Sequence, residues 1–348
     1  WTGEILATVS VERDHDGVVT PSTEHRAVTW SYEPGSIIKP LTFAALLDGG
    51  LAKSDTISEV PYRIRVHDSD FTDSSPHELE EWTVAEIVTR SSNVGTILWA
   101  QEIGAVAFHA KLVDFGLGQV TGLGFPGEAR GILPPVAQWS GTSLPTIAIG
   151  QGVATTPIQM LTSYAALANR GFQPAPTLVL GMRDHEGIYE PAEVKTGRRV
   201  VSEKTADDLV LMIEEAVRSG TGIRAQVPGY RVAGKTGTAW KPHPSGGYGE
   251  EEDEIRYVAS FAGFLPSDAP ELVVLVIIDE PARHSYSGGR AAAPVFSEFA
   301  KFAVRRLRIP AAQERVGLDT LGRVMAATPE QALASMVTEQ VSVASPIG

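Results

Sequence analysis

Two residues near the start of the chain, Ser36 and Lys39, have the types and spacing of a nucleophile and its base. They stand three positions apart, directly after Pro34-Gly35 and before an apolar run over residues 40–47. If a helix begins at Ser36, side chains at i and i+3 share one face, so the lysine amine can reach the serine hydroxyl. The positive end of the helix dipole favours a negative charge developing beside Ser36. The pattern predicts nucleophilic acyl transfer with half of an oxyanion hole.

A serine three residues before a lysine is a weak signal by itself. No other lysine of this chain has one, but a single occurrence in 348 residues is close to what chance gives. The alternative is an ordinary helix start with a serine near its N-cap. The interpretation therefore depends on motifs further along the chain.

The second motif is Ser91-Ser92-Asn93. It follows a short amphipathic stretch, residues 83–90, in which Thr83 and Glu86 have the spacing of a capping box. The alternative is a turn between two helices, because serine and asparagine readily hydrogen-bond to their own backbone.

The third motif is Lys235-Thr236-Gly237-Thr238, directly after the apolar Val232-Ala233-Gly234. The tripeptide also occurs as Lys195-Thr196-Gly197, among charged residues and prolines, where we expect a solvated turn before a strand. The copy at 235 reads as a buried strand whose small residues let a ligand approach closely. We therefore assign the function to the copy at 235 and treat the copy at 195 as a decoy.

These three motifs, in this order, are the combination found in penicillin-binding proteins and serine β-lactamases. Over residues 3–308 the chain resembles the transpeptidase domain of class B penicillin-binding proteins, most closely the cell-division type. Further segments carry the resemblance: Arg26-Ala27-Val28-Thr29, Tyr32-Glu33-Pro34-Gly35, Val94-Gly95, Thr121-Gly122, Phe125-Pro126-Gly127-Glu128, Gly152, Thr156-Pro157-Ile158-Gln159, Gly220-Thr221-Gly222, Gly288-Gly289 and Ala292-Ala293-Pro294-Val295-Phe296.

The resemblance implies peptidoglycan cross-linking. Its substrate is the D-alanyl-D-alanine end of a stem peptide; D-alanine leaves, and the acyl group passes to an amine on a neighbouring strand. It also implies covalent acylation by β-lactams, no cofactor, and a membrane-embedded glycan polymerase together with cell-division proteins as partners. Family members carry a single N-terminal membrane anchor and an extracytoplasmic catalytic domain.

In this interpretation each motif has a role. The catalytic residues are Ser36, Lys39, Ser91, Asn93 and Lys235, and the backbone N–H groups of Ser36 and Thr238 form the oxyanion hole. Burial and the second cation, Lys235, are both expected to lower the pKa of Lys39, so that it can accept a proton. The substrate-binding residues are Thr236, Gly237 and Thr238, with Trp240, Tyr257 and Tyr286 lining the cleft unless they simply pack in the fold.

Composition sets wider limits. The net charge of −13 argues against nucleic acid as a partner, and the absence of cysteine excludes disulfides and thiolate-bound metal. No two of the eight histidines form a ligand pair at helical spacing, so no metal site is expected. No apolar run is long enough to span a bilayer, and the first residue is Trp1, so we expect a fragment of an anchored protein.

The layout of elements predicts an α+β fold of the β-lactamase/transpeptidase type: an antiparallel sheet flanked by helices, plus a mainly helical lobe. Helices are expected at 94–103, 106–115, 156–169, 202–218 and 292–306, and strands at 3–10, 231–238, 257–264 and 272–278. Residues 1–309 form the catalytic domain. Residues 310–348 turn alanine-rich and polar, and are expected to be a tail or the start of another segment.

Three rival functions stay open. A serine β-lactamase shares the motifs but needs a deacylating glutamate, and a Glu-x-x-Leu-Asn segment is missing; Glu128 is the nearest candidate. A D,D-carboxypeptidase transfers the acyl group to water instead of an amine. A β-lactam sensor domain is acylated once and signals without turnover.

Overall fold

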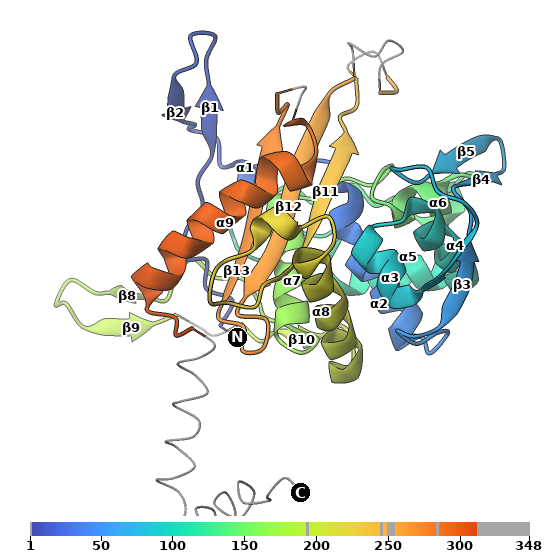
Figure 1. Cartoon of the computed structure of the whole chain (residues 1–348). Coiled ribbons are helices and arrows are strands. Elements are labelled where there is room, and N and C mark those ends of the chain that lie inside the picture. Colours follow the sequence, from blue (N-terminus) through green and yellow to red (C-terminus); the bar gives the residue numbers. More distant parts are fainter. Residues whose placement is uncertain (1, 193–194, 244–245, 249–254, 283–284, 312–348) are drawn as a thin grey trace, which may run out of the picture.

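The computed structural model describes residues 2–192, 195–243, 246–248, 255–282 and 285–311. At its centre lies an antiparallel three-stranded sheet in the order β11-β12-β13 (Figure 1). Lys235 pairs with Ala262, and Phe261 pairs with Val276. The strand that carries the lysine motif is therefore an edge strand of this sheet. The three strands are β11 (Ala233–Trp240), β12 (Tyr257–Leu265) and β13 (Leu272–Asp279).

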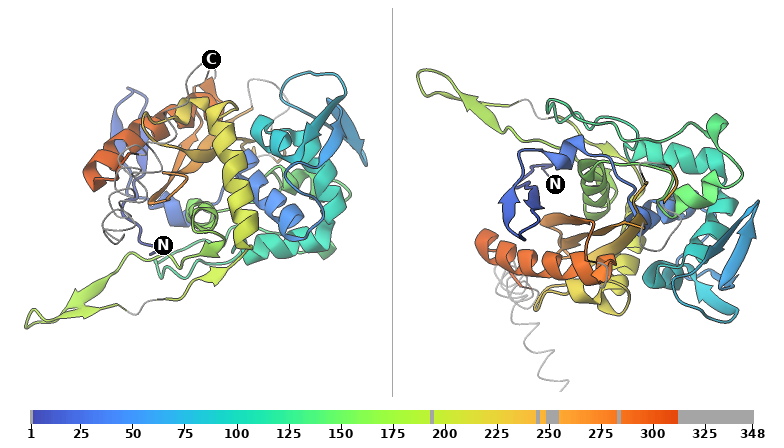
Figure 2. Two further views of the ribbon diagram at one scale, coloured as in Figure 1. Left: turned by 60° about the horizontal axis from the view of Figure 1, so that its bottom comes forward. Right: turned by 90° about the horizontal axis from the view of Figure 1, so that it is seen from above.

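Side-chain alternation along β12 gives the sheet two apolar faces. Phe264 joins the larger core, which includes buried residues of α7 and α8, whereas Phe261 joins a second core beneath α9. The rings of Phe261 and Phe296 lie 4.6 Å apart there. Figure 2 shows the sheet between α9 on one side and α7 on the other. These helices are α7 (Pro157–Ala168), α8 (Glu203–Arg218) and α9 (Gly288–Leu307).

A mainly helical lobe stands beside β11 (Figure 1). Its helices share the larger core with the sheet, so one continuous apolar interior holds the two parts together. Two small two-stranded sheets, β3 with β6 and β4 with β5, belong to this lobe. The lobe comprises η1 (Gly35–Ile38), α2 (Lys39–Asp48), β3 (Ile57–Val60), β4 (Arg63–Val66), β5 (Ser69–Thr72), β6 (Glu80–Thr83), α3 (Val84–Arg90), α4 (Asn93–Ile103), α5 (Ala105–Asp114) and α6 (Ser143–Ala148).

The remaining elements are short. Two hairpins, β1 with β2 and β8 with β9, extend away from the body of the molecule (Figure 1). These elements are β1 (Val11–Arg13), β2 (Val19–Pro21), α1 (Arg26–Thr29), η2 (Val136–Gln138), β7 (Phe172–Gln173), β8 (Gly181–Arg183), β9 (Tyr189–Pro191), β10 (Arg198–Arg199) and η3 (Ile223–Ala225). No helix within the described ranges is both long enough and apolar enough to cross a bilayer.

The predicted α+β arrangement is confirmed, as are the predicted helices and the three central strands. The predicted strand at 3–10 is wrong: only Glu4 makes a bridge there, to Thr177, and the strand starts at Val11 instead. The alternating pattern over 3–10 misled because most of these side chains are exposed, so no packed face selects an extended strand. The predicted tail falls largely on 312–348, outside the described residues.

The helix expected to begin at Ser36 begins one residue earlier, at Gly35, as a 3₁₀ turn, with α2 following from Lys39. Pro40 gives the physical reason. It has no N–H to donate to the Ser36 carbonyl in an α-helical bond, so the Lys39 N–H makes the shorter i→i+3 bond. Three residues per turn place Ser36 and Lys39 on one face, as the spacing predicts.

Candidate active site

Ser36 lies half-buried where the helical lobe meets the sheet. The backbone of η1 runs directly against β11: a Cβ added to Gly35 would lie 2.9 Å from the carbonyl oxygen of Thr238. The N–H of Gly35 donates to the carbonyl of Gly150 at 2.9 Å, which fixes the turn from the other side. The segments expected to supply the two oxyanion-hole N–H groups are therefore in contact.

Lys39 is fully buried, and its amine makes contacts to the second motif. Nζ donates to the Ser91 carbonyl at 2.6 Å and to Asn93 Oδ1 at 2.8 Å, and lies 3.4 Å from Ser91 Oγ. Burial lowers the pKa of Lys39 to about 7, although the carboxylate of Asp73 acts in the opposite direction. A substantial fraction of the amine is thus neutral at neutral pH and able to accept a proton.

The second motif forms the turn between α3 and α4, and its residues also contact the Lys39 amine. The structural and the catalytic interpretations of this motif are therefore compatible. Ser91 ends α3 in the left-handed conformation, with φ 62° and ψ 36°. Ser92 caps α4, and its hydroxyl accepts from the Gly95 N–H at 2.8 Å. The predicted capping box of Thr83 and Glu86 is present at the start of α3. The turn therefore presents Ser91 and Asn93 from two well-anchored helix ends.

Lys235 is the second fully buried amine. Burial, and next the positive charge of Lys39, hold the pKa of Lys235 well below its usual range. Burial is the first cause that lowers the pKa of Lys39 as well. The repulsion between the two amines is mutual, so a charge on one disfavours a charge on the other. The two amines together thus favour at most one positive charge.

The hydroxyls of the two motif threonines are both hydrogen-bonded within the protein. The hydroxyls of Thr236 and Thr221 share a hydrogen bond of 2.7 Å. Thr238 Oγ1 accepts from the Gly288 N–H at 3.0 Å, which leaves the Thr238 proton available to a ligand. Thr221 belongs to a segment that carried the resemblance, but no role was predicted for it.

The three aromatic residues named from the sequence lie at the end of the motif strand. Trp240 pairs across the strands with Tyr257, and the Tyr257 ring stacks on Tyr286 with centroids 4.3 Å apart. Trp240 is 44% exposed and Tyr286 is 42% exposed, and the Trp240 ring also contacts Tyr248. The Tyr248 hydroxyl donates to Glu33, three residues before Ser36. The structure brings these aromatic side chains together beside the site.

The second copy of the tripeptide is on the surface, as predicted. Lys195 is exposed and donates to the Gly122 carbonyl, and the short strand β10 follows it. The copy at 235 is buried almost throughout.

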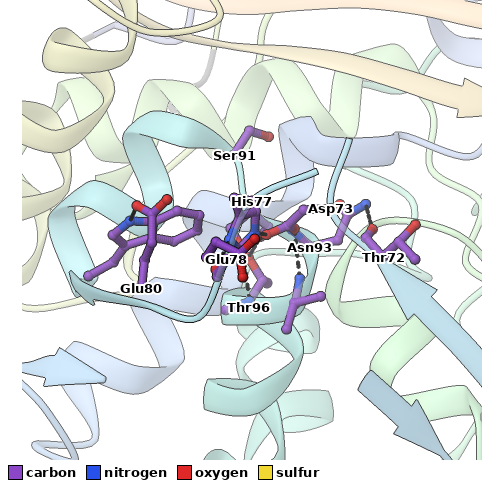
Figure 3. Close-up of polar contacts among 12 residues, drawn as sticks. Thr72, Asp73, His77, Glu78, Glu80, Ser91, Asn93 and Thr96 are labelled. Atoms are coloured by element: carbon purple, nitrogen blue, oxygen red, sulfur yellow. Dashed lines mark hydrogen bonds and ion pairs between the residues drawn. The ribbon is translucent and has the colours of Figure 1, made fainter. Parts of the chain in front are cut away.

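One residue that sequence reasoning missed is Asp73, which follows β5 and is buried beneath the second motif (Figure 3). Its carboxylate accepts from the Ser92 hydroxyl at 2.7 Å and from the N–H groups of Asn93 at 2.5 Å and Val94 at 3.0 Å. The neighbouring Thr72 carbonyl accepts from Asn93 Nδ2 at 3.0 Å. Asp73 is nineteen residues from Ser92, so no local spacing in the sequence reveals the contact.

Among the described residues, no group of three or more histidine, aspartate or glutamate side chains is arranged to hold a metal ion. The family described as the penicillin-binding protein transpeptidase domain has a model that matches residues 1–301 of the chain. The chain belongs to this family.

Known transpeptidases agree with this assignment over most of the chain. The chain is 36% identical over 327 residues to the penicillin-binding protein PbpB of Mycolicibacterium smegmatis, covering 89% of this chain and 49% of the relative. It is 31% identical over 320 residues to the peptidoglycan D,D-transpeptidase FtsI of Escherichia coli K12, covering 88% and 50%. The chain spans about half the length of these relatives.

Solved transpeptidase structures match the fold as well. Penicillin-binding protein 3 of Mycobacterium tuberculosis, complexed with aztreonam, is 34% identical with a TM-score of 0.78, covering 84% of this chain and 66% of that one. The transpeptidase domain of penicillin-binding protein 3 from Burkholderia pseudomallei is 31% identical with a TM-score of 0.75, covering 89% and 87%. The second match shows that the shared fold extends over most of a solved transpeptidase domain.

Proposed function

We propose that this chain is a serine D,D-transpeptidase domain that cross-links peptidoglycan stem peptides through an acyl-enzyme on Ser36. The observation that carries the proposal is the Lys39 amine. It is buried, lies on the Ser36 face of η1, has a pKa of about 7, and is held by Ser91 and Asn93. Such an amine is suited to act as general base for a neighbouring serine.

In the proposed reaction, Ser36 Oγ attacks the carbonyl between the two D-alanines while its proton passes to Lys39. The N–H groups of Ser36 and Thr238 stabilise the oxyanion, a contribution of about 3–4 kcal/mol per donor. The C–N bond then breaks, Ser91 relays the proton to the leaving amine, and D-alanine departs. An amine of a second stem peptide attacks the ester and regenerates the Ser36 hydroxyl.

Lys235 and the motif threonines are proposed to bind the terminal carboxylate of the substrate. The Thr238 hydroxyl already accepts from Gly288, so its proton is free to donate to an anion. A carboxylate beside Lys235 favours the charged amine, which opposes the lowering of its pKa by burial and by Lys39. Substrate binding thus draws a proton onto Lys235 and away from Lys39, leaving Lys39 as the base.

The edge position of β11 supports an extended ligand. An edge strand offers unpaired backbone groups, and a peptide can add to it as a further strand. We propose that the stem peptide lies along β11, with Gly237 permitting the close approach.

The wider cellular setting is also a proposal. The chain spans half of relatives named PbpB and FtsI. We propose a single-pass membrane protein whose catalytic domain is extracytoplasmic and works in cell division with a glycan-strand polymerase.

The test is labelling with a fluorescent penicillin, followed by intact mass, on the wild-type chain and Ser36→Ala. One stable adduct is expected on the wild type and none on a folded Ser36→Ala variant. Rapid loss of the adduct with hydrolysed drug in solution indicates a β-lactamase instead. A folded wild type that never acylates contradicts the proposal.

Turnover separates the other rivals. A D-alanyl-D-alanine peptide with an added acceptor amine should give cross-linked product as well as free D-alanine. Product from water alone indicates a carboxypeptidase, and no D-alanine at all indicates a sensor domain.

The repeated tripeptide supplies a matched pair of variants for the same assay. Lys235→Ala is expected to slow acylation about 10- to 100-fold, the loss of a charge-assisted bond to the ligand carboxylate. Lys195→Ala, in the exposed copy, should acylate like the wild type. Equal rates for the two variants would contradict the assignment of the third motif.

A further inference from the structure

His77 lies against Asp73, and each of its ring nitrogens faces an oxygen (Figure 3). Nδ1 is 2.7 Å from the backbone carbonyl of Glu78, and Nε2 is 3.0 Å from Asp73 Oδ2. The side chains of His77 and Asp73 are only 11% and 6% exposed. This is a buried contact, unlike the other histidine–carboxylate pair of the lobe, His67 with Asp68, whose side chains are 64% and 74% exposed.

The chemistry of these partners fixes the protons on the ring. A carbonyl oxygen can only accept, so Nδ1 of His77 carries a hydrogen. Asp73 already accepts from the Ser92 hydroxyl and from two backbone N–H groups, so both of its oxygens act as acceptors, as in an ionised carboxylate. An ionised carboxylate also only accepts, so Nε2 carries a hydrogen as well. With both nitrogens protonated, His77 is an imidazolium ion.

Three further charged groups, Glu80, Arg90 and Lys39, lie near His77 and Asp73. The His77 ring packs on Trp82 at 4.6 Å and on Tyr62 at 5.9 Å. Beyond Trp82 stand Glu80, which accepts from the indole N–H at 2.8 Å, and the Arg90 guanidinium, 4.8 Å from the ring centroid. On the far side of Asp73 is the amine of Lys39, close enough for the carboxylate to act on it.

We propose that His77 is a positioning residue: as an imidazolium it holds the Asp73 carboxylate against the start of α4, and so keeps Ser91 and Asn93 in place beside Lys39. This inference rests on the proposed function, because Lys39 matters only if it is the base. Asp73 connects His77 with the second motif. One carboxylate binds the α4 backbone and the His77 ring, so moving it moves the second motif.

The pair also adjusts the charge on Lys39. The Asp73 carboxylate raises the pKa of Lys39, against the larger lowering by burial. A positive His77 beside that carboxylate offsets part of its field. Removing the His77 charge should therefore favour protonated Lys39, and removing the Asp73 charge should favour the neutral amine.

The first test reads the charge of His77 directly, by NMR of ¹⁵N-histidine in the whole chain at pH 7.5. The His77 signals, identified by their absence in His77→Gln, are expected to show two protonated nitrogens. A ring with one bare nitrogen overturns the proposal. This result does not depend on enzymatic activity, so it stands apart from any failure of the proposed function.

The second test measures the acylation rate by a fluorescent penicillin against pH. Because neutral Lys39 is the base, the rate rises with pH through a midpoint. We expect His77→Gln to move this midpoint up and Asp73→Asn to move it down, each by about 0.3–1 pH unit. The plateau rate should fall about 10-fold in both variants as the second motif loosens.

His67→Asn is the matched control, because it removes the exposed histidine of the same lobe and asparagine tolerates the left-handed conformation of that position. It should leave midpoint and plateau unchanged. Lower rates with an unmoved midpoint in His77→Gln show a merely structural role and overturn the proposal. If Asp73→Asn does not fold, as judged by its circular dichroism melt, the His77→Gln midpoint and the NMR result decide.

Discussion

Lys39 and Lys235 are neighbouring amines in the protein interior, where two positive charges at once are unfavourable. Both are fully buried, and burial lowers the pKa of each. What distinguishes them is their partners: Lys39 has the Ser91 carbonyl and the Asn93 amide oxygen, whereas Lys235 donates only weakly, at 3.4 Å, to the Thr236 carbonyl. These contacts favour the charged form of Lys39 over that of Lys235, and an anionic ligand beside Lys235 changes that preference.

At the residue scale this predicts the pH dependence of acylation. Below the Lys39 pKa of about 7 the amine is charged and cannot accept the Ser36 proton, so the second-order rate constant should fall as pH drops through 7. Above it the rate should level off. The measurement is acylation by a penicillin from pH 5 to 9, corrected for spontaneous drug hydrolysis.

Lys39→Arg provides the comparison, since arginine stays charged over this whole range. It should acylate at least about 10²-fold more slowly at every pH. A wild-type rate that is flat from pH 5 to 9 would argue against Lys39 as the base.

At the scale of elements, the site depends on how closely η1 and β11 approach each other. Gly35 has φ +56°, and a Cβ there would meet the Thr238 carbonyl at 2.9 Å, with no flexible side chain to give way. Ser36 and the Thr238 N–H belong to these two segments, so a shift of either changes the oxyanion hole.

Gly35→Ala is therefore expected to slow acylation about 10²-fold by forcing η1 and β11 apart. Gly50, after α2, also has a positive φ, +68°, but a Cβ added there would meet nothing within 4 Å. Gly50→Ala should cost about 1–2 kcal/mol of folding stability through backbone strain alone and keep the wild-type acylation rate. Acylation rates would be compared on folded protein; equal rates in both variants would show that the close approach is unimportant.

Which elements the sequence predicts, and which it does not, follows from how local their causes are. The helix at α3 is signalled by Thr83 and Glu86, whose capping box needs no distant partner. The 3₁₀ turn at Gly35–Ile38 follows from Pro40 and is equally local. Asp73 and Ser92 are nineteen residues apart, and their contact depends on the path of the β4–β5 hairpin. A local sequence pattern therefore cannot predict this contact.

At the scale of the whole molecule, two hydrophobic cores pack on opposite faces of one sheet. Ile309, which follows α9, is a buried member of the second core. Ile309 is 5% exposed, and its carbonyl accepts from the Tyr230 hydroxyl at 2.6 Å. The family match ends at residue 301, but this packing extends the proposed catalytic domain to 309.

A chain that ends at Ala311 keeps Ile309 and its contact with Tyr230, and serves as the reference. A chain that ends at Leu307 loses Ile309, at a cost of about 2–4 kcal/mol in unfolding free energy. Its melting temperature should fall by about 4 °C or more in calorimetry. Identical melting of the two shortened chains would move the proposed boundary upstream of Ile309.

The left-handed backbone at Ser91 has a consequence for engineering. A serine in that conformation costs about 1 kcal/mol relative to glycine, which adopts it without a clash. Directed evolution of this protein for heat resistance alone will therefore favour Ser91→Gly, a substitution that improves the melting curve and deletes the proposed proton relay. Mutant libraries selected for thermal stability should keep the Ser91 codon unchanged or be screened for enzymatic turnover in every round.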